Sequence, residues 1–160
     1  MGINFVIAGI IAGLISTSIM TIYEIPFWKL WGIKGILEWH ENQIIGSKIL
    51  KKFKRNNYNV NYAVILLLHI INGVLAAIVF PFVNLIFSYP SFSNRYLLSM
   101  ICGIIYGILL WMLTLLPIHK PITGLSIRNH PLGYGPLIVS FSGHILYGTL
   151  LGTITNILLL

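Results

Sequence analysis

Two histidines are the residues of this 160-residue chain with the clearest capacity for chemistry. His69 and His144 each lie inside a long apolar segment, about seven residues after it begins and four residues before a glycine. Ionisable side chains are rare inside membrane segments and usually face the protein interior, which makes them candidates for function. Two imidazoles at equal depth could be axial ligands of a haem, bind a metal ion, or handle protons or a solute. A neutral imidazole hydrogen-bonded to the next helix is the structural alternative.

A second group of candidate metal ligands lies between the first two apolar segments. Glu38, His40 and Glu41 place two carboxylates three residues apart, on one face of a helix, with a histidine beside them. Membrane enzymes with two metal ions use such residues, but they also carry repeated histidine-rich boxes or a Glu-x-x-His pair, which this chain lacks. Ion pairs with nearby lysines are the alternative.

Two further histidines, His119 and His130, lie between the last two apolar segments. They could close over a cavity beneath the intramembrane histidines, or they could be exposed residues of a simple connection. The rest of the chain offers little to catalysis, since it contains no Asp and no phosphate loop, nucleophile elbow or zinc-protease helix. The only cysteine, Cys102, allows no internal disulfide. The sequence therefore favours a non-enzymatic protein without deciding the question, and it identifies no cofactor.

The composition predicts an integral membrane protein. Hydrophobic residues make up 57% of the chain and charged residues only 8%, whereas soluble domains carry about 25% charged residues. Four apolar segments satisfy the requirement of roughly 20 residues for a helix that crosses a bilayer. They cover residues 3–23, 62–83, 96–116 and 137–158. We expect residues 1–160 to form one all-α membrane domain, a four-helix bundle.

The basic residues predict the orientation of these helices. Nine of the ten Lys and Arg residues lie in the connections 24–61 and 117–136, whereas Arg95 alone lies in the connection between the second and third helices. Because cytoplasmic loops of membrane proteins are rich in Lys and Arg, both basic connections are expected in the cytoplasm and both termini on the opposite side of the cell membrane. Prolines and glycines are dense in 117–136, so the third helix is expected to stop at Pro117 and a non-helical connection to follow.

The first connection has an amphipathic character of its own. Residues 26–39 hold three of the four tryptophans, and residues 44–53 mix apolar and basic side chains. Both are predicted to be interfacial helices lying in the headgroup plane, with partner docking as the alternative. Anionic lipid headgroups are the expected partners of a basic cluster that consists of Lys48, Lys51, Lys52, Lys54 and Arg55. No soluble basic module is visible, so no nucleic-acid partner is expected.

Small residues at four-residue spacing occur in every apolar segment. Such spacing keeps them on one helix face, where they let neighbouring backbones approach closely in a bilayer. The predicted packing residues are Gly9, Gly13, Gly73, Gly103, Gly107, Gly148 and Gly152. The glycine pairs of the first and third segments match each other, as do the His-x-x-x-Gly motifs of the second and fourth. Two repeated hairpins would explain this similarity, and chance would explain it equally well.

The order of these motifs resembles small, uncharacterised four-helix membrane proteins of the YagU-like inner-membrane kind. The resemblance rests on Gly9-x-x-Ala12-Gly13 with Ser18-Ile19-Met20-Thr21, His69-x-x-x-Gly73, Gly103-x-x-Tyr106-Gly107 with Trp111, Pro117, and His144-x-x-Tyr147-Gly148. It implies a four-helix fold, and because the activity of such proteins is unassigned, it implies no catalytic residue.

Three functions are compatible with the sequence. The first is a non-enzymatic membrane protein that forms a homo-oligomer or an accessory subunit of a larger membrane complex, since packing motifs are abundant and extramembrane domains are lacking. The second is a redox protein that binds haem or a metal ion through His69 and His144. The third is a small transporter or proton pathway that uses the same two histidines together with Asn72.

Overall fold

Four long apolar helices form the body of the protein. The computed structural model describes residues 4–52, 61–87 and 95–159, and all regular structure in these ranges is helical. Four helices are long and apolar enough to cross a membrane, which confirms the predicted all-α four-helix architecture. They are α1 (Phe5–Trp31), α3 (Tyr62–Phe87), α4 (Arg95–Leu110) with its continuation to Thr123, and α6 (Gly135–Leu159).

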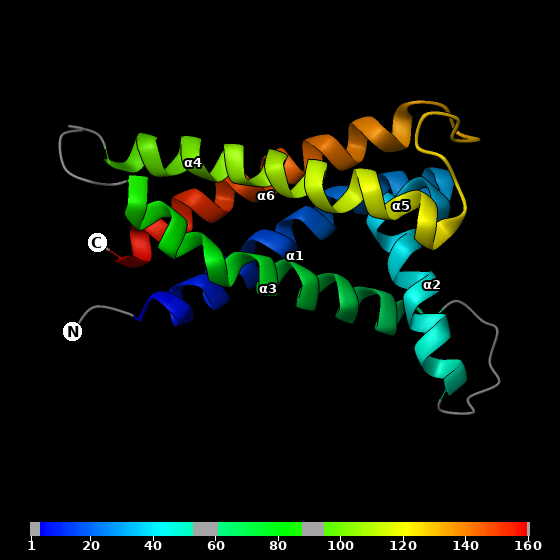
Figure 1. Ribbon diagram of the computed structural model, residues 1–160, viewed down its shortest axis with the longest axis horizontal. Helices are drawn as coiled ribbons and strands as arrows, with labels where there is room; N and C mark the ends of the chain where they lie inside the picture. The colour runs from blue at the N-terminus through cyan, green and yellow to red at the C-terminus, as the bar shows by residue number, and fades with distance from the viewer. Residues whose placement is uncertain (1–3, 53–60, 88–94, 160) are drawn as a thin grey trace.

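The four helices do not contact one another equally. Helix α1 packs along both α3 and α6, and α4 packs along α6, whereas α3 and α4 touch each other far less. In Figure 1 the described chain begins and ends at one end of the bundle, and the short helices α2 (Leu37–Lys52) and α5 (Leu116–Thr123) lie at the other. The arrangement leaves space between α3 and the continuation of α4 at the α2–α5 end.

Glycines allow the closest helix crossing, between α4 and α6. A Cβ atom placed on Gly103 would lie 2.1 Å from the carbonyl oxygen of Gly148, and one on Gly107 would lie 2.2 Å from that of His144. In the α1–α3 pair, a Cβ on Gly9 would lie 2.8 Å from the Cα atom of Ile78. Gly9, Gly103, Gly107, Gly148 and Gly152 therefore lie where a neighbouring backbone is too close for a side chain, whereas Gly13 and Gly73 make room for the side chains of Ala77 and Thr17.

The two halves of the chain have the same plan. In each half a long helix is followed by a short helix and then by a second long helix that packs back on the first: α1, α2 and α3, then α4, α5 and α6. The matching glycines occupy matching crossings, since Gly9 meets α3 where Gly103 meets α6. This arrangement is what the two-hairpin interpretation of the sequence similarity requires.

The first helix is longer than predicted. Helix α1 continues through Glu24 and Pro26 to Trp31, so the separate interfacial helix expected over 26–39 is wrong. The helix ends at Gly32, whose φ of 68° is readily adopted only by glycine and whose N–H donates to the carbonyl of Trp28 at 2.8 Å. A short 3₁₀ turn, η1 (Ile33–Gly35), then leads into α2.

The third helix also passes the point where it was expected to stop. After α4 the chain forms a π turn, η2 (Trp111–Leu115), and then α5, so the connection 117–136 is helical at its start rather than non-helical throughout. A proline lacks the N–H for the helical hydrogen bond, and its ring crowds the preceding turn. Because a π turn is wider than an α turn, η2 accommodates Pro117 without ending the helix.

Helix α2 caps the end of the bundle. Its second half corresponds to the helix predicted over 44–53, but its first half buries Leu37, Trp39, His40 and Asn42. Figure 1 shows α2 running across the direction of the long helices. Of the basic cluster, Lys48 and Lys51 are exposed on α2. The side chain of Lys52, and Lys54 and Arg55 as a whole, lie outside the described residues.

Candidate functional site

Glu24 is a fully buried carboxylate near the α2–α5 end of α1. It is 0% exposed, and its Oε2 atom accepts a hydrogen bond from the indole N–H of Trp39 at 2.7 Å. The same oxygen lies 3.5 Å from Nε2 of His69 on α3. The ring of Trp39 packs edge-on against the imidazole of His69, with ring centroids 6.3 Å apart. Three elements, α1, α2 and α3, therefore meet at this carboxylate.

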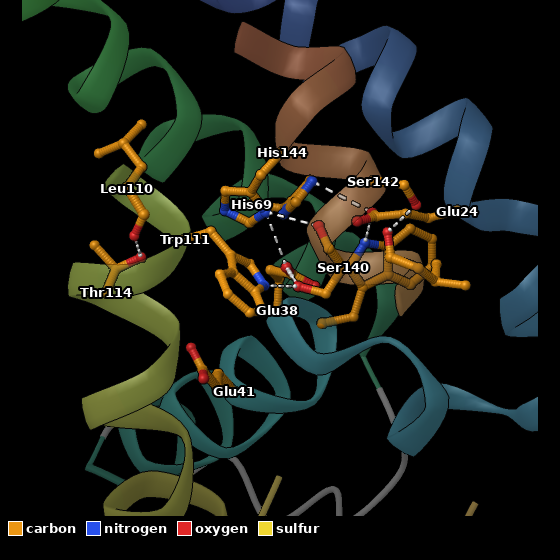
Figure 2. A network of polar contacts seen from close by, with 12 residues as sticks. Glu24, Glu38, Glu41, His69, Leu110, Trp111, Thr114, Ser140, Ser142 and His144 are labelled. Atoms are coloured by element: carbon orange, nitrogen blue, oxygen red, sulfur yellow. Dashed lines mark hydrogen bonds and ion pairs between the residues drawn. The ribbon is translucent and has the colours of Figure 1, made fainter. Parts of the chain in front are cut away.

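Glu38 forms a second carboxylate–histidine pair with the other half of the molecule. Its Oε1 atom lies 3.3 Å from Nδ1 of His144 and accepts a hydrogen bond from the hydroxyl of Ser140, both on α6. The indole N–H of Trp111, in the π turn, donates to the Ser140 hydroxyl at 3.1 Å. Figure 2 shows His69 of α3 and His144 of α6 within this network, together with Glu38 and Ser140. The π turn thus contributes directly to the surroundings of Glu38.

Glu41 forms the third pair, with His119 of α5. Nδ1 of the His119 imidazole lies 3.0 Å from Oε1 of Glu41 and donates to it. Burial raises the pKa of the Glu41 carboxyl above its usual value, although the hydrogen bond from His119 acts in the opposite direction. A carboxyl group with a raised pKa gains and loses protons closer to neutral pH than an exposed one does.

The remaining histidines, His40 and His130, surround His119. The rings of His40 and His119 are 5.9 Å apart. Burial, together with the neighbouring charges of His119, Lys34 and His130, lowers the pKa of His40 to about 4. Burial and the proximity of His119 also lower the pKa of His130. Both rings are therefore neutral at physiological pH, and they separate the Glu41–His119 pair from solvent.

A cavity of about 380 Å³ lies beside these pairs, and Glu38, Glu41, His69 and His144 line it. All the long helices and both short ones contribute to its wall. Its principal polar lining residues are Glu38, Glu41, Asn42, His69, Asn72 and His144. Its apolar wall includes Leu75, Ala76, Leu110, Leu115, Ile118 and Ile122.

The cavity reaches the apolar outer surface of the bundle. Leu75 of α3 and Ile118 of α5 both line it, and they are 60% and 40% exposed. This opening lies where α3 and α4 have few contacts, so a molecule dissolved in the bilayer could enter sideways. The amide of Asn72 donates to the side-chain oxygen of Asn42 at 3.3 Å, and this hydrogen bond joins α3 to the cap formed by α2.

The structure brings the two intramembrane histidines together but separates the second group of candidates. His69 and His144 both line the cavity, as do Glu38 and Glu41. His40 is not among the residues of the wall and packs against His119 instead. Within the described residues, no group of three or more His, Cys, Asp or Glu side chains has a geometry that would hold a metal ion. The metal and haem hypotheses therefore stay predictions.

Several residues of the site were missing from the sequence-based candidates. Glu24 was assigned to the end of the first helix, because a charged residue after an apolar segment usually marks the membrane boundary. Ser140, Trp39 and Trp111 carried no signal of their own, since each becomes part of the site only through a hydrogen bond to a residue distant in sequence. A carboxylate followed by seven more helical residues was the one signal that could have identified Glu24.

Comparisons with known proteins add no family. No family model, no curated protein and no solved structure matches the chain. The resemblance to YagU-like proteins therefore stays a prediction. The fold and the site define the class of protein, a multi-pass membrane protein whose helical bundle contains a cavity with an apolar wall and a few ionisable side chains.

Proposed function

We propose that the chain is a small transporter that binds a solute in the cavity and exchanges protons with it. The observation that carries this proposal is that each of three histidine–carboxylate pairs contributes at least one side chain to the wall of one cavity: His69 from the first pair, Glu38 and His144 from the second, and Glu41 from the third. Each pair joins two different helices, and imidazole and carboxyl groups are the side chains that most readily transfer protons near neutral pH.

The location of these charges supports transport over a purely structural role. Removing a carboxylate from water costs several kcal/mol, and an ion pair recovers this only partly. A subunit that only packs against others needs no such groups, because glycine crossings already hold these helices together. Membrane proteins that keep ionisable groups inside the bundle usually use them for ions, protons or ligands. The accessory-subunit hypothesis stays a prediction, which a native-mass measurement in mild detergent would test.

The distribution of the pairs supports solute-coupled exchange over a simple proton channel. All three carboxylates and all five histidines of the chain lie toward the α2–α5 end. The opposite half of the bundle has none of these groups, so it offers no continuous series of imidazole and carboxyl groups across the membrane. Protons can therefore be exchanged at the cavity. The bound solute must then cross the other half of the membrane through a conformational change of the protein.

The haem alternative conflicts with the position of one imidazole. Axial ligation needs a free ring nitrogen on each histidine. Nε2 of His69 faces Oε2 of Glu24, and Nδ1 of His144 lies between Glu38 and the carbonyl of Ser140. His69 would therefore have to leave Glu24 to bind iron through Nε2. A Soret band in the purified protein that is lost in the His69→Ala variant would favour haem over transport.

We place the α2–α5 end of the bundle in the cytoplasm. The exposed basic residues Lys48, Lys51, Lys120 and Arg128 lie on α2, on α5 or in the turn after it, whereas Arg95 begins α4 at the opposite end. This distribution follows the positive-inside rule, and it supports contact of α2 with anionic lipid headgroups.

Proton movement in liposomes tests the proposed function. The full chain is reconstituted with a pH-sensitive dye inside, and amines, carboxylates, amino acids and sugars are added outside. We expect at least one class to move protons faster than in empty liposomes, and we expect Glu38→Gln to abolish the difference. Lys48→Gln is the matched control, because Lys48 is exposed on the same helix as Glu38 and is not among the residues of the cavity wall. If no class moves protons faster than in empty liposomes, the proposal is wrong.

A further inference from the structure

The cavity has a chemistry that selects its ligand by charge. Two carboxylates, Glu38 and Glu41, line it, and none of the described residues of its wall is Lys or Arg. The basic side chains Lys48 and Lys120 are instead exposed on the outside of α2 and α5. An anion in the cavity would meet two carboxylates in a low-dielectric environment with no Lys or Arg side chain in the described wall to compensate for them, whereas a cation would be stabilised there.

One carboxylate oxygen of Glu38 lacks a hydrogen-bond partner in the part of the chain that the structure describes. Its Oε1 atom is occupied by Ser140 and His144. Its Oε2 atom is buried and has no hydrogen-bond partner among the described residues. A buried oxygen without a partner costs free energy, and the cost is greater for a charged group, so a ligand that donates to it gains this energy. A primary ammonium group has three N–H donors and would match this acceptor.

The rest of the cavity indicates that the cation is not a bare ion. Much of its wall is aliphatic, formed by residues such as Leu75, Leu110 and Ile122. A volume of about 380 Å³ falls at the lower end of the roughly 300–1,000 Å³ range of small-molecule pockets. Small inorganic cations prefer several oxygen ligands and have no use for an apolar wall. The lateral opening at Leu75 and Ile118 would admit a molecule with an apolar body directly from the bilayer.

We infer that the cavity binds a small organic amine, with its ammonium group at Oε2 of Glu38 and its apolar body between α3 and the α4–α5 segment. This inference rests on the proposed function and names the substrate class of the same site. Proton exchange is chemically balanced in this arrangement, because an ammonium group that gives its proton to the Glu38 carboxylate leaves a neutral amine and a carboxylic acid. The neutral amine can then leave through the apolar opening.

Three ligands with the same apolar body test the assignment. Phenethylamine is a cation at neutral pH, 2-phenylethanol is neutral, and 3-phenylpropionate is an anion. Binding to the full chain in detergent is measured by calorimetry and by tryptophan fluorescence, since Trp39 and Trp111 belong to the network. We expect the amine to bind at least tenfold more tightly than the alcohol and the anion not to bind. Equal binding of the amine and the alcohol would overturn the inference.

Two variants locate the amine, and a third is the control. Glu38→Gln should weaken amine binding at least tenfold and leave the alcohol unaffected. Ala76→Leu, which fills part of the cavity without changing any charge, should weaken both ligands. Lys48→Gln, which removes a charge from the exposed side of the same helix, should change neither. Glu38→Gln could also perturb folding, so loss of amine binding counts only if the unfolding midpoint of this variant equals that of Lys48→Gln. Otherwise the Ala76→Leu result decides, and unchanged binding there refutes the location.

The binding experiment tests the amine site and the liposome experiment tests the transporter, so each hypothesis can be refuted without the other. Amine binding without proton movement in liposomes would leave the amine site in place and refute the transporter. Proton movement driven by carboxylates or sugars, without amine binding, would leave the transporter in place and refute the amine. Binding of Zn²⁺ alone, with no effect of any of the three organic ligands, would assign the cavity to a metal ion and overturn the inference.

Discussion

Replacing Gly107 by alanine tests how closely α4 and α6 pack and whether this crossing positions the site. A Cβ atom at residue 107 would lie 2.2 Å from the carbonyl oxygen of His144 and 3.2 Å from the Cα atom of Gly148. Restoring an ordinary contact of 3.4 Å requires the two backbones to separate by about 1.2 Å. Overpacking of this kind typically costs about 1–3 kcal/mol. Because the crowded carbonyl belongs to His144, the separation also moves its imidazole relative to Glu38.

The assay is equilibrium unfolding of the full chain in mild detergent, followed by tryptophan fluorescence. We expect Gly107→Ala to lower the free energy of unfolding by about 2 kcal/mol, near the middle of the range for overpacked sites, and to weaken ligand binding in the cavity. The matched control is Ile105→Ala on the same helix, since Ile105 is 53% exposed and belongs to the outer face. A Gly107→Ala variant as stable as this control would refute the close α4–α6 crossing.

Three further predictions concern His40, Glu24 and the orientation of the chain in the membrane. The first concerns His40, whose pKa is 6.5 in the unfolded chain and about 4 in the folded protein. Between pH 6.5 and pH 4 this side chain is therefore protonated more often in the unfolded chain than in the folded protein. The free energy of unfolding should therefore fall as the pH drops through this window, by up to about 3 kcal/mol, and His40→Gln should flatten a pH series of unfolding curves. The second concerns Glu24. Glu24→Ala leaves the buried Trp39 N–H without an acceptor and should lower the free energy of unfolding by about 2–3 kcal/mol, whereas Glu24→Gln keeps an acceptor and should lower it clearly less. Equal losses in the two variants would contradict the assigned hydrogen bond. The third concerns the orientation and uses two single-cysteine variants in cells. Ser47→Cys should react with an impermeant thiol reagent only after the cells are permeabilised, whereas Asn4→Cys should react before permeabilisation. The reverse pattern would invert the proposed orientation.

The four helices could be predicted from composition, but their ends could not. Apolar length alone determines that a segment can cross a bilayer, and each predicted segment corresponds to a long helix. The ends were misplaced at Glu24 and Pro117, where a charge and a proline usually stop a membrane helix. In the folded protein a neighbouring helix supplies the Glu24 carboxylate with a hydrogen-bond donor, and a π turn accommodates the proline. Both solutions depend on contacts that no local pattern contains.

Part of the site could also be predicted. The spacing of His69 and His144 within their segments indicated equal depth, and the structure places both on one cavity. Their carboxylate partners could not be predicted, because Glu38 reaches His144 only after the chain has turned at Gly32 and α2 has folded across the end of the bundle. Separation in sequence says nothing about such a pairing, which is created by the packing of the cap.

The two halves of the chain share a backbone plan but not a charge distribution. Their helix order and glycine crossings match, and each half contributes one intramembrane histidine. All three carboxylates, however, belong to the first half. His69 pairs within its own half, with Glu24, whereas His144 must pair across the halves, with Glu38. A scaffold with the same plan in both halves but carboxylates in only one of them therefore forms a cavity that both halves line, and neither half could form that cavity alone.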